Sequence, residues 1–289
     1  WSSSPPGFKA PCPLPPSGGT KMGEAGLWRE GTVSMKGGGS SIDTSKGTTT
    51  VPDRSVSSTG SDRVAAPRGL FITFEGIDGS GKSTQAESSF RSLIEELGEE
   101  RLLRTFEPGG WTGGETIRSA ILRRDLKSVF TETFLFLADR TEHVERVIEP
   151  GLTSGKLVLC ERFSDSTLAY QVYGKGFPRE ILEEINARAG FPRPDITFWF
   201  DVPVQEAIER IAARKGVPDR FEKDGALLDR IRLGYETICS EDPERFIRLD
   251  GTAKPDHLNR TVVTRILGML KESRGISRRI SKDKGRARE

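Results

Sequence analysis

The glycine-rich stretch Gly76–Ser83, with the sequence GIDGSGKS, carries the most specific chemical signal in the chain. It fits the pattern G-x-x-x-x-G-K-[ST], in which glycines let backbone N–H groups close around phosphate oxygens. An apolar run precedes it and a helical pattern follows, so the start of a helix adds partial positive charge at the same place. This stretch predicts a site for a nucleoside triphosphate, formed by Gly76, Ile77, Asp78, Gly79, Ser80, Gly81, Lys82, Ser83 and Thr84.

Two residues of this loop carry its expected chemistry. Lys82 can reach the β- and γ-phosphates, and Ser83 can ligate Mg²⁺. GTPase-type switch proteins share the loop, but they need a guanine-reading N-K-x-D sequence that this chain lacks. Large P-loop ATPases need a strand that ends in an Mg²⁺-binding Asp, whereas the nearest equivalent here, Leu157–Arg162, ends in Glu161 before Arg162. Small nucleotide or metabolite kinases are therefore the leading class.

Strands and helices must alternate to position this loop. Helical patterns lie between the short apolar runs. The first follows the glycine-rich loop and ends at about Leu97, and the others cover 116–123, 132–148, 205–213 and 256–271. Strands separated by helices predict a parallel sheet that is covered on both faces. The expected fold is α/β, a doubly wound five-stranded parallel sheet, with strands at Leu70–Glu75, Leu102–Phe106, Lys156–Cys160, Asp195–Asp201 and Arg245–Asp250.

The two ends of the chain differ in composition from its middle. Residues 1–69 are rich in Gly, Ser, Pro and Thr and are expected to be disordered, because they cannot bury enough apolar surface. Residues 70–272 are expected to form the domain, and 273–289 a basic flexible tail. A targeting segment is the alternative for the first 69 residues, but acidic residues such as Glu24 and Glu30 argue against it.

Charge and cysteine usage exclude several classes of protein. The net charge is +2, and since both ends are basic, the middle is acidic, unlike a uniformly basic nucleic-acid binder. No apolar stretch is long enough for a membrane span. Cys12, Cys160 and Cys239 have no metal-ligand spacing and no disulfide pattern, as expected for thiols in a reducing cytosol, so a cytoplasmic location is expected.

Further motifs along the chain resemble those of the bacterial thymidylate kinases. The phosphate loop extends to the sequence FEGIDGSGKSTQ at Phe74–Gln85, and the spacing and order of the later motifs also agree. The resemblance spans roughly residues 70–270 and leaves both ends uncovered. The later motifs are TFEPGG at Thr105–Gly110, FLADR at Phe136–Arg140, ERFSDSTLAYQ at Glu161–Gln171 and PDITFWFDV at Pro194–Val202.

The resemblance implies an acceptor site for dTMP. It assigns Arg162 and Arg118 to the acceptor phosphate, which a guanidinium can hold bidentately. The resemblance also implies that Phe136 stacks on the thymine and that Arg140, one helical turn later, contacts the O4 edge of the base. Without the family, these residues would more simply be surface ion-pair arginines and a core phenylalanine. The remaining implied roles are base contacts from Thr167 and Gln171, exclusion of a ribose hydroxyl by Tyr170, and carboxylates near the acceptor sugar and phosphate at Asp78 and Glu107.

A lid at about 210–224 is also implied. Because this phosphate loop contains no arginine, the resemblance makes Arg214 and Arg220 catalytic on lid closure, beside Lys82 and Arg162. A solvated charged loop is the plainer interpretation of the same stretch. The implied metal ligands for Mg²⁺ are Ser83 and Glu161.

The sequence departs from the family pattern at three positions. Glu161 replaces an Asp, Phe106 replaces an Arg, and Trp111 replaces a small residue. His143 and His257 match no family site, and both are expected at the surface.

The most specific hypothesis is a P-loop nucleoside monophosphate kinase that transfers the γ-phosphate of ATP to dTMP with Mg²⁺ and yields dTDP, for dTTP biosynthesis. The resemblance implies a homodimer, and neither a nucleic-acid nor a membrane partner is expected. Two alternatives remain open: a kinase for another nucleotide or nucleoside, and a non-catalytic nucleotide-sensing protein.

Overall fold

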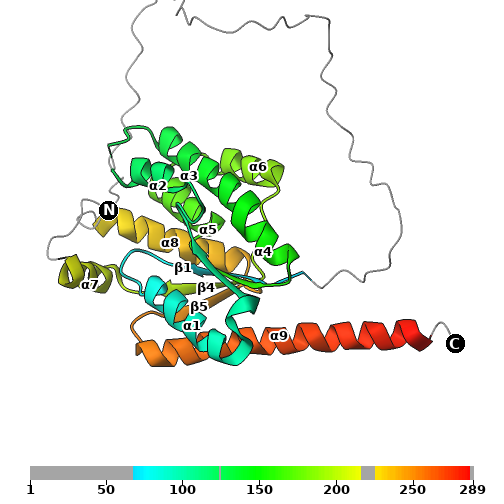
Figure 1. Ribbon diagram of the computed structural model, residues 1–289. Helices are drawn as coiled ribbons and strands as arrows, with labels where there is room; N and C mark the ends of the chain where they lie inside the picture. Colours follow the sequence, from blue (N-terminus) through cyan, green and yellow to red (C-terminus); the bar gives the residue numbers. More distant parts are fainter. Residues whose placement is uncertain (1–67, 124, 216–224, 287–289) are drawn as a thin grey trace, which may run out of the picture. The chain divides into compact units, whose positions relative to one another are not determined.

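Five parallel strands form a single sheet in the computed structural model, which describes residues 68–123, 125–215 and 225–286 (Figure 1). The strands are β1 (Phe71–Glu75), β2 (Leu102–Phe106), β3 (Leu157–Glu161), β4 (Ile196–Asp201) and β5 (Phe246–Asp250). Their order across the sheet is β2-β3-β1-β4-β5, and every neighbouring pair is parallel. The predicted doubly wound five-stranded sheet is confirmed.

Helices connect the strands in chain order. They are α1 (Lys82–Leu97), α2 (Glu115–Leu122), α3 (Val129–His143), α4 (Glu149–Thr153), α5 (Ser164–Thr167), α6 (Arg179–Ala189), α7 (Val204–Lys215), α8 (Gly225–Glu241) and α9 (Pro255–Arg286). Shorter helical turns fill some of the links: a 3₁₀ turn at Glu99–Arg101, and π-helical turns at Val144–Ile148 after α3 and Leu168–Gly174 after α5.

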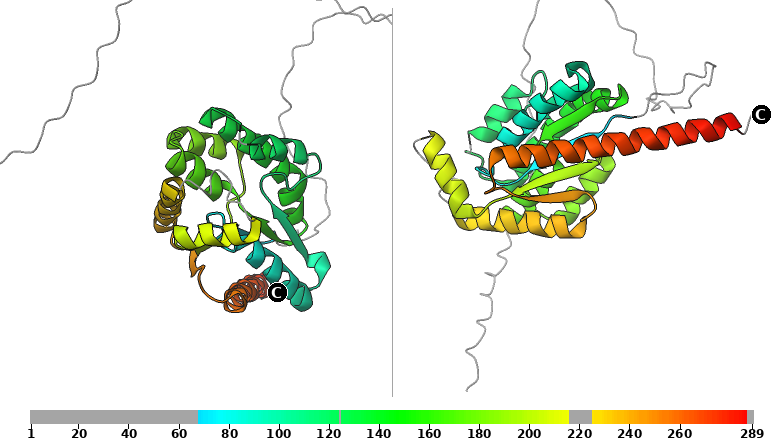
Figure 2. Two further views of the ribbon diagram at one scale, coloured as in Figure 1. Left: turned by 90° about the vertical axis from the view of Figure 1, so that its left-hand side faces the viewer. Right: turned by 90° about the horizontal axis from the view of Figure 1, so that it is seen from below.

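Helices α1 and α9 lie side by side on one face of the sheet, and α3, α4 and α8 lie on the other (Figures 1 and 2). The central strand β1 packs against both layers: Ile72 and Phe74 join the core under α1 and α9, while Phe71 joins the core beside α4. A central strand of a parallel sheet is buried on both faces, which explains its unbroken apolar run. Trp199 of β4 is 2% exposed and packs on the side of α8, as expected for a core residue.

The ends of the described chain differ from the expected boundaries. The first 67 residues lie outside the described part, but Gly69 is buried and its N–H donates to the carbonyl of Leu152 at 2.8 Å, so order begins before residue 70. Helix α9 continues past the expected end at Lys271 to Arg286, and therefore includes most of the stretch expected to be a flexible tail. No proline interrupts this stretch, and its many Lys and Arg residues have good helix propensity.

No helix in the described ranges has both the length and the apolar character that a membrane span requires.

One buried ion pair links α5 to the start of β5. Arg245 holds Asp165 with two hydrogen bonds, of 2.6 and 3.0 Å, and also donates to Thr197 on β4 at 2.8 Å. Only 10% of the Arg245 side chain and 7% of the Asp165 side chain are exposed. The pair fixes the segment that directly follows the end of β3.

We expect Asp165→Ala to lower the free energy of unfolding by about 1–3 kcal/mol, because it removes two hydrogen bonds from a buried guanidinium, which keeps Asp242 as its second carboxylate partner at 2.8 Å. Glu184→Ala removes an exposed ion pair with Arg188 and should lower the free energy of unfolding by less than about 1 kcal/mol. Urea denaturation of both variants measures the difference, and equal effects would contradict the role of the Asp165–Arg245 pair.

Candidate active site

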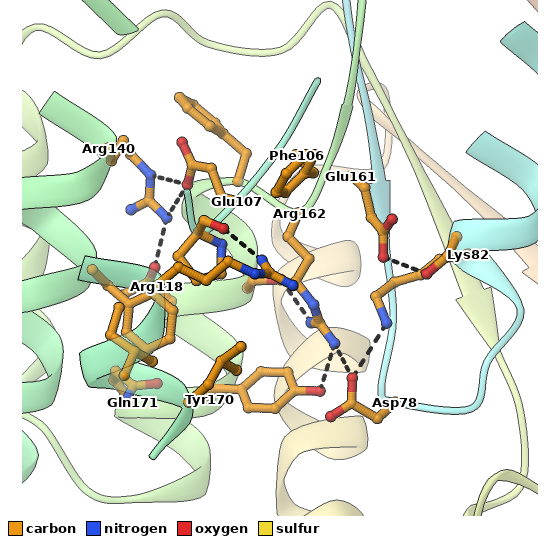
Figure 3. A pocket seen from close by; sticks show the side chains of 18 of the residues that line it. Asp78, Lys82, Phe106, Glu107, Arg118, Arg140, Glu161, Arg162, Tyr170 and Gln171 are labelled. Carbon is orange, nitrogen blue, oxygen red and sulfur yellow. Dashed lines mark hydrogen bonds and ion pairs between the residues drawn. The ribbon is translucent and has the colours of Figure 1, made fainter. Parts of the chain in front are cut away.

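A cavity of about 590 Å³ opens at the carboxyl ends of β1, β2 and β3. This edge of an open parallel sheet is where doubly wound proteins bind ligands. The cavity joins the phosphate loop to the residues expected around the acceptor (Figure 3). All nine residues predicted for the acceptor site line it: Asp78, Glu107, Arg118, Phe136, Arg140, Arg162, Thr167, Tyr170 and Gln171.

The phosphate loop lies between β1 and α1. Gly79 has φ +82°, and a Cβ there would lie 2.4 Å from the carbonyl oxygen of Ala207, so only glycine fits. Ile77 is 2% exposed and packs in the core, so it contributes its backbone alone. Of the nine residues predicted for the triphosphate site, those that line the cavity are Asp78, Gly79, Gly81, Lys82, Ser83 and Thr84, whereas Gly76, Ile77 and Ser80 do not.

Lys82 is 4% exposed and lies at the first turn of α1. Its Nζ is 3.3 Å from the carbonyl oxygen of Ile77 and 3.5 Å from Asp78 Oδ1. Burial, and next the charge of Arg162, lower the pKa of its ammonium group, while Asp78 and Glu161 oppose this shift. The lysine is thus enclosed beside the loop with few protein partners, as a phosphate-binding cation requires.

Ser83 and Glu161 meet across the cavity floor. The Ser83 hydroxyl donates to Glu161 Oε1 at 2.5 Å, which joins the start of α1 to the end of β3. The glutamate that replaces the expected aspartate therefore reaches the loop serine directly. Among the described residues, no group of three or more His, Cys, Asp or Glu side chains could hold a metal by itself.

Arg162 links the phosphate loop to the acceptor side. Its backbone has φ +66°, an unusual conformation for a residue other than glycine. Its Nη2 donates to Asp78 Oδ1 at 2.5 Å and to the Tyr170 hydroxyl at 3.1 Å, and its guanidinium carbon is 4.9 Å from the centre of the Tyr170 ring. Figure 3 shows these three side chains gathered beside Lys82.

Glu75, the last residue of β1, lies beneath Arg162 and was missed by the sequence analysis. Its carboxylate accepts from the Phe163 N–H at 2.7 Å, from the Ser166 hydroxyl at 2.5 Å and from the Tyr235 hydroxyl at 2.9 Å. Ser166 in turn accepts from Arg162 Nη1 at 3.1 Å. Burial is the main cause that raises the pKa of Glu75 to about 7, and the charge of Asp165 adds to it. A single acid at the end of an apolar strand was the available sequence signal.

The opposite end of the cavity holds Phe136, Arg140, Thr167 and Gln171. Arg140 is 1% exposed, and it donates to Glu107 through Nε at 2.9 Å and to the Thr167 hydroxyl through Nη2 at 2.7 Å. Within the described ranges, its Nη1 has no hydrogen-bond partner, and neither does Nε2 of the buried Gln171. Buried N–H groups are rarely left unpaired. Both residues line the cavity, although these two nitrogen atoms are themselves enclosed.

The two other departures from the family pattern contact neighbouring residues of the site. The ring of Phe106 lies under the guanidinium of Arg118, 5.2 Å from its carbon, and Arg118 Nη1 also donates to the Pro108 carbonyl at 2.6 Å. Trp111 donates through its indole N–H to Asp139 on α3 at 2.8 Å.

The expectation that both histidines lie at the surface is wrong for His143. His257 is exposed, but His143 is completely buried and contacts Thr105 and Glu107. It follows Arg140 by three residues and so lies on the same face of α3, a spacing that could have revealed it.

The predicted lid arginines are not placed. Arg220 lies outside the described residues, and Arg214 belongs to α7 without a described side chain. Arg210, at the start of the expected lid, lies within α7 and lines the cavity; its Nη1 donates to the Gly251 carbonyl at 2.9 Å. No sequence motif assigned a role to Arg210.

This strand order, with a phosphate loop after the central strand and one cavity that extends from the loop to α3, defines a P-loop kinase of the nucleoside monophosphate type. The sequence profile of thymidylate kinase matches residues 74–262. The chain belongs to the thymidylate kinase family.

Individual relatives agree with this assignment. A thymidylate kinase of Chlorobium chlorochromatii is 40% identical over 215 residues, which cover 70% of this chain and 96% of that protein. One of Ruegeria pomeroyi is 41% identical over 212 residues, covering 71% and 98%. The crystal structure of a thymidylate kinase from Ehrlichia chaffeensis superposes with a TM-score of 0.59 at 32% identity, covering 70% of this chain and 100% of that one.

The raised pKa of Glu75 predicts a pH-dependent stability. Its protonated form is favoured in the folded state, so its contribution is complete below its usual value of 4.5 and is lost as the pH rises through about 7. The glutamine side chain of Glu75→Gln resembles the protonated carboxylic acid, so this variant should not lose stability as the pH rises. The variant should therefore gain stability relative to the natural protein between pH 5 and pH 8, by up to about 3 kcal/mol.

Urea denaturation of both proteins at the two pH values tests this expectation. A stability difference between them that does not change with pH would contradict it, and any constant cost of the substitution cancels in the comparison.

Proposed function

We propose that this protein transfers the γ-phosphate of ATP to dTMP and produces dTDP for dTTP biosynthesis. The observation that carries the proposal is one cavity with a phosphate loop at one end and two buried, unpartnered N–H donors, on Arg140 and Gln171, at the other. Thymine presents carbonyl oxygens at its edge, and these accept from such donors. Phe136 also lines this end and can stack on the ring.

The reaction follows from how charge is distributed along the cavity. The acceptor phosphate oxygen is already anionic, so no dedicated general base is needed. Lys82 and Arg162 both line the cavity, and we assign them to the place where charge develops on the transferred group. Catalysis of phosphoryl transfer depends mainly on positioning and on charge neutralisation. Tyr170 is held by Arg162, and we assign it to the side of the sugar where a ribose hydroxyl would lie.

Mg²⁺ fits the oxygen pair of Ser83 and Glu161. Mg²⁺ prefers oxygen ligands and usually keeps several waters beside one or two protein groups and substrate phosphates, so two protein oxygens are sufficient. When bound, the ion would neutralise charge on the β- and γ-phosphates. The Ser83 hydroxyl and the Glu161 carboxylate would hold it at the junction of α1 and β3.

Several further parts of the hypothesis rest on the family resemblance. We propose that Arg214 and Arg220 supply catalytic charge when a lid at about 210–224 closes, and that residues 1–68 can be removed with little effect on the folding and catalysis of the domain. A homodimer is proposed, with support from two half-exposed aromatic side chains on α3, Phe130 and Phe134. A cytoplasmic location fits the free thiols of Cys160 and Cys239.

A coupled assay with ATP, Mg²⁺ and dTMP tests the function directly. We expect dTMP-dependent ATP turnover, and Lys82→Ala should lower kcat by about 10²-fold or more, because it removes a charge placed on the transferring phosphate. Lys254→Ala, which changes an exposed lysine before α9, is the matched control and should leave kcat unchanged.

Near-normal turnover by a folded Lys82→Ala protein would contradict the site. ATP binding without any turnover would favour the nucleotide-sensing alternative, and turnover with another nucleotide but not with dTMP would favour a different kinase.

A further inference from the structure

His143 is a buried polar side chain that no step of the proposed reaction uses. It lies at the last residue of α3, with none of its surface exposed, and it does not line the cavity. Buried polar side chains are costly unless their hydrogen bonds are made, so its partners indicate its role.

Both ring nitrogens of His143 contact the segment that follows β2. Nδ1 is 3.0 Å from Glu107 Oε1, and Nε2 is 2.6 Å from the Thr105 hydroxyl. The other oxygen of Glu107, Oε2, accepts from Arg140 Nε at 2.9 Å. An ionised carboxylate only accepts hydrogen bonds, so we assign the Nδ1 proton to His143 as the donor to Glu107.

Glu107 is therefore held between two side chains of α3, with one oxygen for each. Arg140 contacts Glu107 Oε2 through Nε at 2.9 Å and through Nη2 at 2.8 Å. Its Nη2 also donates to Thr167, and only Nη1 lacks a hydrogen-bond partner among the described residues. The direction of Nη1 depends on the guanidinium plane, which Glu107 holds together with Thr167 and the ring of Phe163, whose centre is 5.0 Å from the guanidinium carbon. The orientation of the Glu107 carboxylate depends in turn on the histidine.

Helix α3 holds the same segment at a second place. Asp139 accepts from the Gly109 N–H at 2.9 Å and from the Trp111 indole at 2.8 Å. Asp139 thus fixes the backbone turn at Gly109, whereas His143 fixes the Glu107 carboxylate, which contacts Arg140.

We propose that His143 is a positioning residue for pyrimidine recognition: it orients Glu107 and, through it, directs Arg140 Nη1 at the acceptor base. This rests on the proposed function, because the base is that of dTMP. His143 itself does not touch the substrate.

Three substitutions separate positioning from packing. The amide of His143→Asn can put an N–H near the position of Nδ1, whereas the amide of His143→Gln reaches only the position of Nε2, and His143→Ala provides neither. We expect Gln and Ala to raise KM for dTMP by about 10-fold to 100-fold, the scale of misplacing a binding group. Asn should stay within about threefold of the natural protein, and kcat and KM for ATP should change by less than about threefold in all three.

A double variant tests whether the effect passes through Arg140. If it does, adding His143→Ala to Arg140→Ala should raise KM for dTMP by less than about twofold beyond Arg140→Ala alone. Thr133→Val is the matched control, since it removes a buried hydroxyl that donates within its own helix, to the Val129 carbonyl, and it should leave KM unchanged.

Equal increases of KM for dTMP in the Asn, Gln and Ala variants, equal increases for ATP, or additive effects with Arg140→Ala would each overturn the proposal in favour of simple packing. If His143→Ala does not fold, the comparison of Asn with Gln decides. Absence of dTMP turnover in the natural protein is a different result, because it contradicts the proposed function itself.

Discussion

The ion pair between Asp78 and Arg162 joins the two halves of the site. Asp78 belongs to the phosphate loop after β1, and Arg162 follows β3, the next strand of the sheet. A cation at this place would be repelled by Lys82, and the carboxylate between them offsets that repulsion. The pair therefore keeps the positive charges of Lys82 and Arg162 close together at the junction of the phosphate loop and the end of β3.

The sheet and the phosphate loop could be predicted because their signals are local, whereas the acceptor roles of the nine cavity residues stay a prediction. The strand pattern and the spacing of GIDGSGKS are contained in short segments, and the nine acceptor residues lie in motifs that the resemblance covers. Glu75 and His143 could not be assigned in this way. Their partners are Ser166 and Tyr235 in one case and Thr105 and Glu107 in the other, far apart in sequence, so their roles exist only in the folded domain. The length of α9 was missed because basic composition was equated with flexibility.

Buried acids support both arginines of the acceptor side from behind. Glu75 acts on Arg162 through Ser166, and Glu107 contacts Arg140 directly. Since burying an unpaired charge is costly, each acid lets its arginine remain enclosed while part of the guanidinium stays available. At the base end, the unpartnered groups of the described residues are donors, Arg140 Nη1 and Gln171 Nε2. These donors support the proposal that the pocket is complementary to a base edge that accepts hydrogen bonds.

This complementarity is the central claim, and kcat/KM for dTMP, dUMP and dCMP tests it most directly. Cytosine presents an amino group where thymine presents O4. The N–H of Arg140 would then face the amino group of cytosine, and both donors would stay unpaired. The structure predicts that kcat/KM for dCMP is at least about 10²-fold below that for dTMP, because each unpaired buried polar group costs about 1–3 kcal/mol. The value for dUMP should lie between the two, because uracil keeps O4 and lacks only the methyl group. Similar values for dTMP and dCMP would contradict the account.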